Sequence, residues 1–344
     1  MNSPGGKFIF WLVYLLVASC ISPFEPVIVK DNPKLTVDGL ITDQPGPYRI
    51  TLRYSAPYVN DETVFSRYEA NASVSIFDDL GNSETLSYKE YGVYETLPDF
   101  IGKVGRSYSL NIKVPNGKTY QSQPEQLRQT AAIDSVYTTY EELHGVYLRG
   151  LFSLYLDFSD PIESKDFYQW DWVHYKFEPY CLISYKYNRA VNCCGPCWSI
   201  DRCYGCIHIQ SDKFYNGQKV KRIAITTIPY ETKDPYFIII KQKSLTESAY
   251  KFWQSVSEQI ENAGGIFDKP PVTIKGNIVN INDPTEQVLG FFGASSIVEK
   301  SIYIPRNKID KPPFGALPNF QTANTCIPCS VGGGFRTDQK PVGW

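Results

Sequence analysis

Cysteine is the residue type in this chain whose spacing most clearly allows chemistry. Beyond the first third of the sequence the cysteines gather in two regions, and six of them form C-x-x-C motifs. The set is Cys181, Cys193, Cys194, Cys197, Cys203, Cys206, Cys326 and Cys329. This spacing is compatible with three kinds of chemistry, namely disulfide bonds, a thioredoxin-like redox centre and a zinc site.

The redox and zinc interpretations each lack part of their usual context. Cys194-Gly-Pro-Cys197 has the thioredoxin spelling, but no strand-helix alternation surrounds it to place the first thiol at a helix N-terminus. The next C-x-x-C motif follows after a gap shorter than the roughly 15–20 residues typical of zinc-binding pairs. We therefore expect disulfides that staple a cysteine-rich excursion over residues 181–206, with no metal and no cofactor. Their connectivity stays open, because eight cysteines allow about 105 pairings.

Motifs for enzymatic catalysis are lacking elsewhere in the sequence. The histidines are His144, His174 and His208, and none has the H-E-x-x-H spacing of a metalloprotease. G-x-S-x-G, the P-loop and G-x-G-x-x-G are also absent. A carboxylate pair of the glycosidase kind remains compatible with the many Asp and Glu residues. We expect a non-enzymatic protein.

An aromatic segment offers a candidate binding face. In the sequence FYQWDWVHY at 167–175, a strand would place Tyr168, Trp170 and Trp172 on one side. If exposed, these rings could stack on a glycan or contact a peptide or partner protein. The alternative is that a second sheet or a helix covers them as part of the core.

These residues require a mainly β scaffold to position them. Residues 34–126 alternate apolar and polar positions between turn sequences such as Asn116-Gly117, which predicts an immunoglobulin-like β-sandwich. Residues 131–320 contain further strand patterns, which predict a second β-rich domain carrying at least one packed helix. That helix is expected over 245–262, where apolar residues recur at three- and four-residue steps after a capping-box sequence at 244–247.

The N-terminal sequence predicts export and lipidation. Lys7 precedes an apolar run from 8 to 18, and small residues then lead to Cys20. The run is too short for a membrane span. We expect residues 1–19 to be a lipoprotein signal peptide, Cys20 to carry the lipid and residues 20–33 to form a tether to the membrane.

Composition limits the partners further. The net charge of −2 and 20% charged residues give no basic surface for nucleic acid. Aromatic residues reach 15%, with 25 Tyr and a single Met, which favours strands over helices.

Several segments resemble one known protein family. They are LTVDGLITDQPGPY at 35–48, FYQW at 167–170, SLTESAY at 244–250, VLGFF at 288–292 and the C-terminal segment 321–344 with its CIPC motif. Together they are similar to a Bacteroidetes outer-membrane lipoprotein family, domain of unknown function 4249.

The resemblance implies a location and a partner. It implies an outer-membrane lipoprotein, lipid-anchored and facing the cell surface rather than the periplasm, that accompanies a TonB-dependent, SusC-like barrel protein. It carries no catalytic residue over to this chain. The alternative is a stand-alone surface lipoprotein that binds carbohydrate or peptide through the aromatic face.

Overall fold

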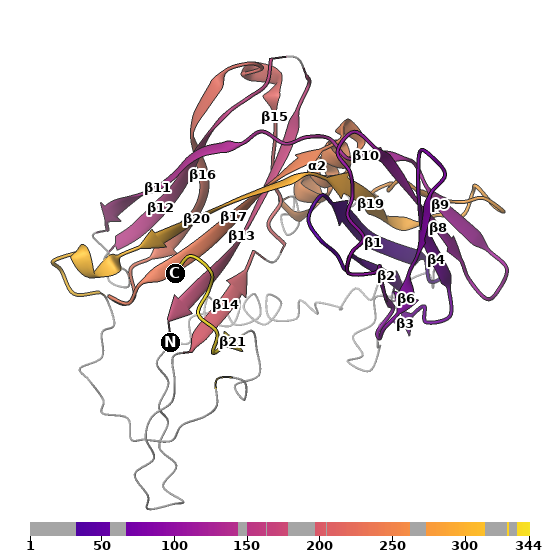
Figure 1. Ribbon diagram of the computed structural model, residues 1–344, viewed down its shortest axis with the longest axis horizontal. Helices are drawn as coiled ribbons and strands as arrows, with labels where there is room; N and C mark the ends of the chain where they lie inside the picture. The colour runs from indigo at the N-terminus through magenta and orange to yellow at the C-terminus, as the bar shows by residue number, and fades with distance from the viewer. Residues whose placement is uncertain are drawn as a thin grey trace, which may run out of the picture. The chain divides into compact units, whose positions relative to one another are not determined.

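The computed structural model describes residues 32–55, 67–143, 150–162, 164–177, 197–203, 205–261, 273–313, 329 and 336–344. This part of the chain is mainly β, as predicted, with four sheets and one α-helix (Figure 1). The predicted signal peptide, Cys20 and most of the tether lie outside the described residues. Among the described helices, none has the length and apolarity needed to cross a membrane.

Two sheets built mostly from the first part of the chain face a common core. Sheet A contains β1 (Leu35–Thr42), β2 (Arg49–Tyr54), β3 (Arg67–Tyr68), β6 (Ser87–Tyr88), β7 (Val93–Glu95) and β19 (Leu289–Ser295). Sheet B contains β4 (Ser73–Asp78), β5 (Ser83–Thr85), β8 (Ser107–Lys113), β9 (Thr119–Ser122), β10 (Glu125–Gln126) and β18 (Ile278–Asn280). Alternate residues such as Val37, Ile50, Val74 and Ile112 are fully buried between them.

The sequence boundary at 126 does not enclose this first pair of sheets. β19 pairs in parallel with β1, from Thr36 opposite Leu289 onward, and β18 pairs antiparallel with β9. Phe292 of β19 is fully buried in the same core. The predicted 34–126 module is thus completed by strands from the region assigned to the second domain, because β1 and β9 would otherwise be unpaired edges. Its immunoglobulin-like topology stays a prediction.

The remaining two sheets form a second pair. Sheet C has the order β11 (Ile133–Glu142), β12 (Gly150–Ser159), β16 (Lys219–Pro229). Sheet D has the order β20 (Ile297–Ile304), β17 (Tyr236–Leu245), β13 (Phe167–Phe177), β14 (Trp198–Arg202), β21 (Arg336–Thr337), with β15 (His208–Ser211) also on β13. Leu154 and Phe158 of sheet C are buried with Ile238 and Ile240 of sheet D in one core. In Figure 1 these two sheets diverge toward the ends labelled β11 and β14.

The predicted helix 245–262 is observed as α2 (Glu247–Glu261). Thr246 caps it, since its hydroxyl accepts a hydrogen bond from the Ala249 N–H at 3.1 Å. The cap therefore lies two residues after the predicted Ser244, whose hydroxyl instead donates to the Arg128 carbonyl. Ala249 and neighbouring apolar side chains of α2 pack against Phe167 and Phe291. Two short 3-10 helices, η1 (Asp212–Phe214) and η2 (Arg306–Lys308), complete the described elements.

Candidate ligand-binding cavity

The three aromatic residues predicted as a binding face separate into two environments. Tyr168 and Trp170 are only 1% and 2% exposed. Phe158 of β12 covers both, with ring centres 4.9 Å and 5.9 Å away, and the Trp170 indole N–H donates to Gln242 at 2.8 Å. Of the two alternatives that the sequence left open, a covered face therefore holds for these two residues, because sheet C buries this part of β13. Trp172, further along the strand, is only half-buried.

Trp172 lies where a cavity opens between sheets C and D. The cavity has a volume of about 470 Å³. The residues that line it include Trp172, His174, Asp201, Thr226, Tyr236 and Arg306. They come from β13, β14, β16, β17 and η2. Volumes of this order suit a small organic ligand.

His174 forms an uncharged aromatic wall beside Trp172. Its imidazole stacks on the indole, with ring centres 5.2 Å apart and planes inclined by 13°, and it also contacts Tyr236 at 4.8 Å. Nε2 lies 3.4 Å from the Asp201 carboxylate, while Nδ1 is buried with no hydrogen-bond partner among the described residues. Burial lowers the pKa of His174 to about 4, so the ring is neutral at pH 7.

Arg306 borders the same cavity as a buried cation. Arg306 is only 1% exposed, and its guanidinium carbon lies over the Tyr236 ring, 5.3 Å from the ring centre. Nε donates to the Asp234 carbonyl at 2.7 Å and Nη2 to the Thr232 hydroxyl at 2.8 Å. These acceptors are neutral. Burial lowers the pKa of Arg306 from its usual high value, although arginine stays protonated at pH 7.

A disulfide fastens the C-terminal segment to one wall of the cavity. Cys197 and Cys329 are bonded, with Cα atoms 5.6 Å apart and a sequence separation of 132. Beside this bond β21 pairs with β14, which places Arg336 opposite Ser199. Trp344 then packs against Trp198, with ring centres 5.7 Å apart. Within the predicted segment 321–344, β21 thus joins sheet D and Trp344 packs against it.

A second disulfide joins Cys203 to Cys206 within one motif. The Cys203 N–H donates to the Trp172 carbonyl at 3.2 Å, so this turn also borders the cavity strand. Since Cys197 is bonded to Cys329, it does not form the Cys194–Cys197 pair that thioredoxin chemistry uses. The predicted partners Cys181, Cys193, Cys194 and Cys326 lie outside the described residues.

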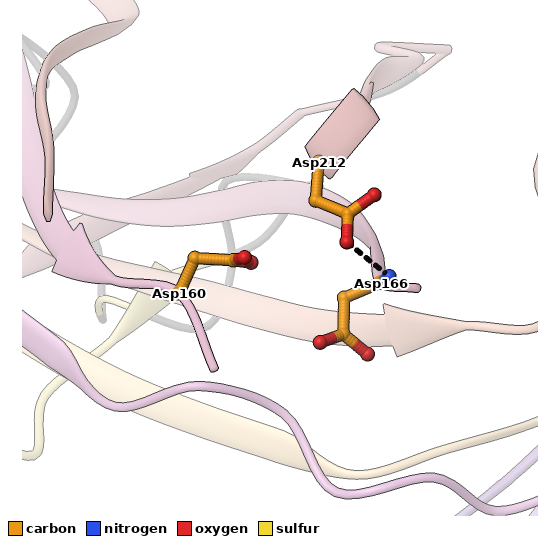
Figure 2. Close-up of side chains that lie close together, drawn as sticks. All are labelled: Asp160, Asp166 and Asp212. Carbon is orange, nitrogen blue, oxygen red and sulfur yellow. Dashed lines mark hydrogen bonds between the residues drawn. The ribbon is translucent and has the colours of Figure 1, made fainter. Parts of the chain in front are cut away.

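Three buried aspartates gather near the start of β13 (Figure 2). One carboxylate oxygen from each of Asp160, Asp166 and Asp212 lies within 4.8 Å of the others, a spacing that a hard cation such as Ca²⁺ could use. The chain supplies donors to these oxygens. Asp160 accepts from the Tyr168 hydroxyl at 2.6 Å and from the Gly217 N–H at 3.0 Å, and Asp212 accepts from the Asp166 N–H at 2.7 Å. We therefore assign the cluster a structural role, holding β13 to η1.

Comparison with protein-family models assigns the chain to a family. A family model described as Domain of unknown function (DUF4249) matches residues 21–301. The chain belongs to the DUF4249 family. The predicted membership of domain of unknown function 4249 is thus confirmed, and the match includes Trp172 and His174 but ends before Arg306 and Cys329. No curated protein matches the chain.

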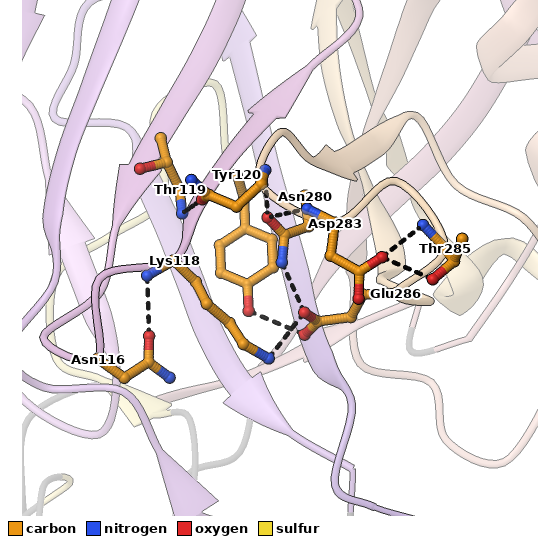
Figure 3. A network of polar contacts seen from close by, with 9 residues as sticks. Asn116, Lys118, Thr119, Tyr120, Asn280, Asp283, Thr285 and Glu286 are labelled. Atoms are coloured by element: carbon orange, nitrogen blue, oxygen red, sulfur yellow. Dashed lines mark hydrogen bonds and ion pairs between the residues drawn. The ribbon is translucent and has the colours of Figure 1, made fainter.

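Another polar network in this DUF4249 protein lies at β9 and β18 of sheet B (Figure 3). Glu286 accepts hydrogen bonds from the Tyr120 hydroxyl at 3.0 Å and the Asn280 amide at 2.6 Å, and it forms an ion pair with Lys118 at 2.7 Å. Thr119 donates its N–H to Asn282 at 2.7 Å. These contacts fasten β18 and the loop after it to β9, so the network completes sheet B.

Of the cavity residues named above, sequence reasoning assigned only Trp172 to a candidate site of this DUF4249 protein. His174 was detectable, because it lies two residues after Trp172 and therefore on the same face of β13. Arg306 carried no such signal. It follows the strand pattern 302–304 in a short polar segment, and only the tertiary structure brings it beneath Tyr236.

Proposed function

We propose that this DUF4249 protein is a non-enzymatic outer-membrane lipoprotein that acts as a partner of a TonB-dependent, SusC-like transporter, in docking or ligand capture. The cavity beside Trp172 is the observation that carries ligand capture, because it combines an aromatic wall with hydroxyl and charged groups in one recess. The predicted signal peptide 1–19, followed directly by Cys20, supports the proposed membrane anchor.

The geometry around His174 supports a binding role over catalysis. A hydrolytic triad requires the histidine to be hydrogen-bonded to a nucleophile. The Ser199 hydroxyl, on the same cavity wall, donates to the Lys176 carbonyl at 3.5 Å instead. Within the described residues His174 Nδ1 has no hydrogen-bond partner, and Asp201 is 63% exposed in its side chain. Nothing in this arrangement activates a nucleophile.

A stand-alone surface lipoprotein that binds carbohydrate or peptide is the second candidate. The cavity favours it too, since Trp172 offers an aromatic surface and Thr226 and Ser199 offer hydroxyls. In this form the ligand contacts the cavity instead of the predicted face, because Tyr168 and Trp170 are buried.

The partnership is tested by co-purification from outer membranes of a Bacteroidetes host in mild detergent. We expect the lipidated chain to retain a TonB-dependent barrel in stoichiometric amount, and Cys20→Ser to abolish both lipid labelling and recovery from the membrane. A chain that is lipidated yet purifies alone would contradict the partnership and favour the stand-alone role. Protease treatment of intact cells then distinguishes the two leaflets, and we expect cleavage, as for a protein at the cell surface.

A further inference from the structure

Arg306, which lines the cavity, is a buried cation whose hydrogen-bond acceptors are all neutral. Arginine has five N–H donors, and the contacts of Arg306 are with the Asp234 carbonyl, the Thr232 hydroxyl and the Pro229 carbonyl at 3.4 Å. Among the described residues, no carboxylate lies within ion-pairing distance of the guanidinium. Glu231 and the Asp234 side chain act on it only at longer range. A buried charge without a close counter-ion is costly, so this site favours an added anion.

The other charged groups of the cavity wall are already engaged. Lys176 forms an ion pair with Glu231 at 3.2 Å. Asp201 faces His174 and accepts the Arg202 N–H at 2.9 Å. Arg336, on β21, also borders the cavity and has an interaction partner of its own.

The surface next to Arg306 suits a ligand with a flat or apolar part. Tyr236 carries the guanidinium on one face, and His174 and Trp172 continue the aromatic wall away from it. Thr226, on sheet C, lines the cavity across from these rings. The lining of this recess thus combines a cation with three aromatic rings.

Resting on the ligand-capture role proposed above, we propose that the cavity binds a ligand bearing a carboxylate, which pairs with Arg306 while the adjoining part of the ligand packs on Trp172. Guanidinium and carboxylate match in planar geometry, and such charge-assisted hydrogen bonds are about twice as strong as neutral ones. Two sources offer this chemistry: the C-terminal carboxylate of a short peptide and the uronic acid of an acidic glycan.

Calorimetric titration of the full lipidated chain in detergent tests the proposal with two matched probe pairs. One pair is an N-acetylated tripeptide with a free C-terminus and the same peptide with a C-terminal amide. The other is a galacturonic acid trisaccharide and the neutral galactose trisaccharide. We expect the acid of one pair to bind at least tenfold more tightly than its neutral counterpart, and the pair that responds identifies the source.

Variants locate the binding in the cavity. Arg306→Gln should remove the preference for the acid, and Thr226→Phe should block binding of both members of the pair. Lys221→Gln, which removes an exposed charge from the same sheet, should leave binding unchanged. Because Arg306→Gln could disturb the fold, circular dichroism accompanies each variant, and Arg306→Lys, which keeps the charge, should retain part of the preference.

Three outcomes would overturn the proposal: equal binding of acid and neutral probes, an acid preference that survives in folded Arg306→Gln, or no binding of either acid. Each leaves the partnership with a transporter intact, since co-purification tests that independently. If the neutral trisaccharide binds the parent as tightly as the acid does but does not bind Thr226→Phe, ligand capture in the cavity stands and only the requirement for a carboxylate is refuted.

Discussion

The buried carboxylate of Glu125 accepts a hydrogen bond from the Ser248 hydroxyl at 2.7 Å, which fastens β10 to the first turn of α2. The Thr246 hydroxyl donates to the same carboxylate, and the Asn277 amide approaches it at 3.4 Å. A carboxylate beside a helix N-terminus also interacts favourably with the helix dipole. Glu125 thus connects the two pairs of sheets through one acidic group that is 1% exposed.

Replacing Glu125 by alanine should lower the free energy of unfolding by about 2–4 kcal/mol, because the donors of Thr246, Ser248 and Asn277 lose their acceptor at once. Glu125→Gln should cost less, since an amide oxygen still accepts. Urea denaturation measures both. Glu141→Ala, at an exposed position of β11, is the control, and an equal loss in Glu125→Ala and Glu141→Ala would refute this role.

Trp170 and Trp172 should respond differently to truncation. Trp170→Ala removes a buried indole from the core between sheets C and D and should cost about 3–5 kcal/mol of unfolding free energy. Trp172→Ala, at a half-buried position, should cost clearly less while removing ligand binding in the cavity. Denaturation curves of the two variants check this, and a stable, fully folded Trp170→Ala would show that sheet C does not cover that residue.

The Cys197–Cys329 bond should contribute more stability than the Cys203–Cys206 bond. A cross-link that closes a loop of 132 residues restricts the unfolded chain far more than one that closes a loop of 3. Replacing both cysteines of the long loop by serine should cost about 4 kcal/mol, and the same change in the short loop about 1–2 kcal/mol. Denaturation under oxidising conditions tests the order, and peptide mapping without reduction verifies both pairings.

Protonation of His174 should destabilise the protein in acid. The pKa of His174 is about 4 in the folded protein against an ordinary value of 6.5. Between pH 6.5 and pH 4 the imidazole is protonated in the unfolded chain but neutral in the folded chain. The contribution of neutral His174 to stability is therefore complete above about pH 6.5 and is lost as the pH falls toward 4. His174→Gln should therefore lose less stability than the parent between pH 7 and pH 4.5.

Two measurements examine this sign. Unfolding free energies of parent and His174→Gln at both pH values give the difference directly. NMR titration of the imidazole should show a midpoint well below 6. Parallel pH profiles, or an imidazole that titrates near 6.5, would mean that the ring is not buried between Trp172 and Tyr236.

Local sequence patterns predicted the individual strands and the helix of this fold better than they predicted which elements pack or pair with each other. Alternation identified β1, β2, β4 and β8 because one face of each is buried and the other is solvated. The spacing of Ala249, Tyr250 and Trp253 identified α2 because that stripe packs on sheet D. In both cases the information lies within a few neighbouring residues.

Long-range pairing was beyond such patterns. The sequence pattern of β13 is the same whether its aromatic face contacts solvent or another sheet. Trp170 could therefore be assigned to the core only from the position of sheet C, whose Phe158 contacts it. The bond between Cys197 and Cys329 likewise depends on β21 reaching β14, which cysteine spacing does not encode. The cavity shares this limit, since Thr226, Trp172 and Arg306 come from separate elements.

The parallel contact of β1 with β19 also dictates an order of assembly. Non-local contacts form slowly, because the intervening chain must first be closed into a loop. A chain that emerges N-terminus first presents β1 early, with β2 as its partner, and the other edge of β1 stays bare until Leu289–Ser295 follow. The core that is first in sequence is therefore closed late, and until then its open edge can pair with a neighbouring molecule.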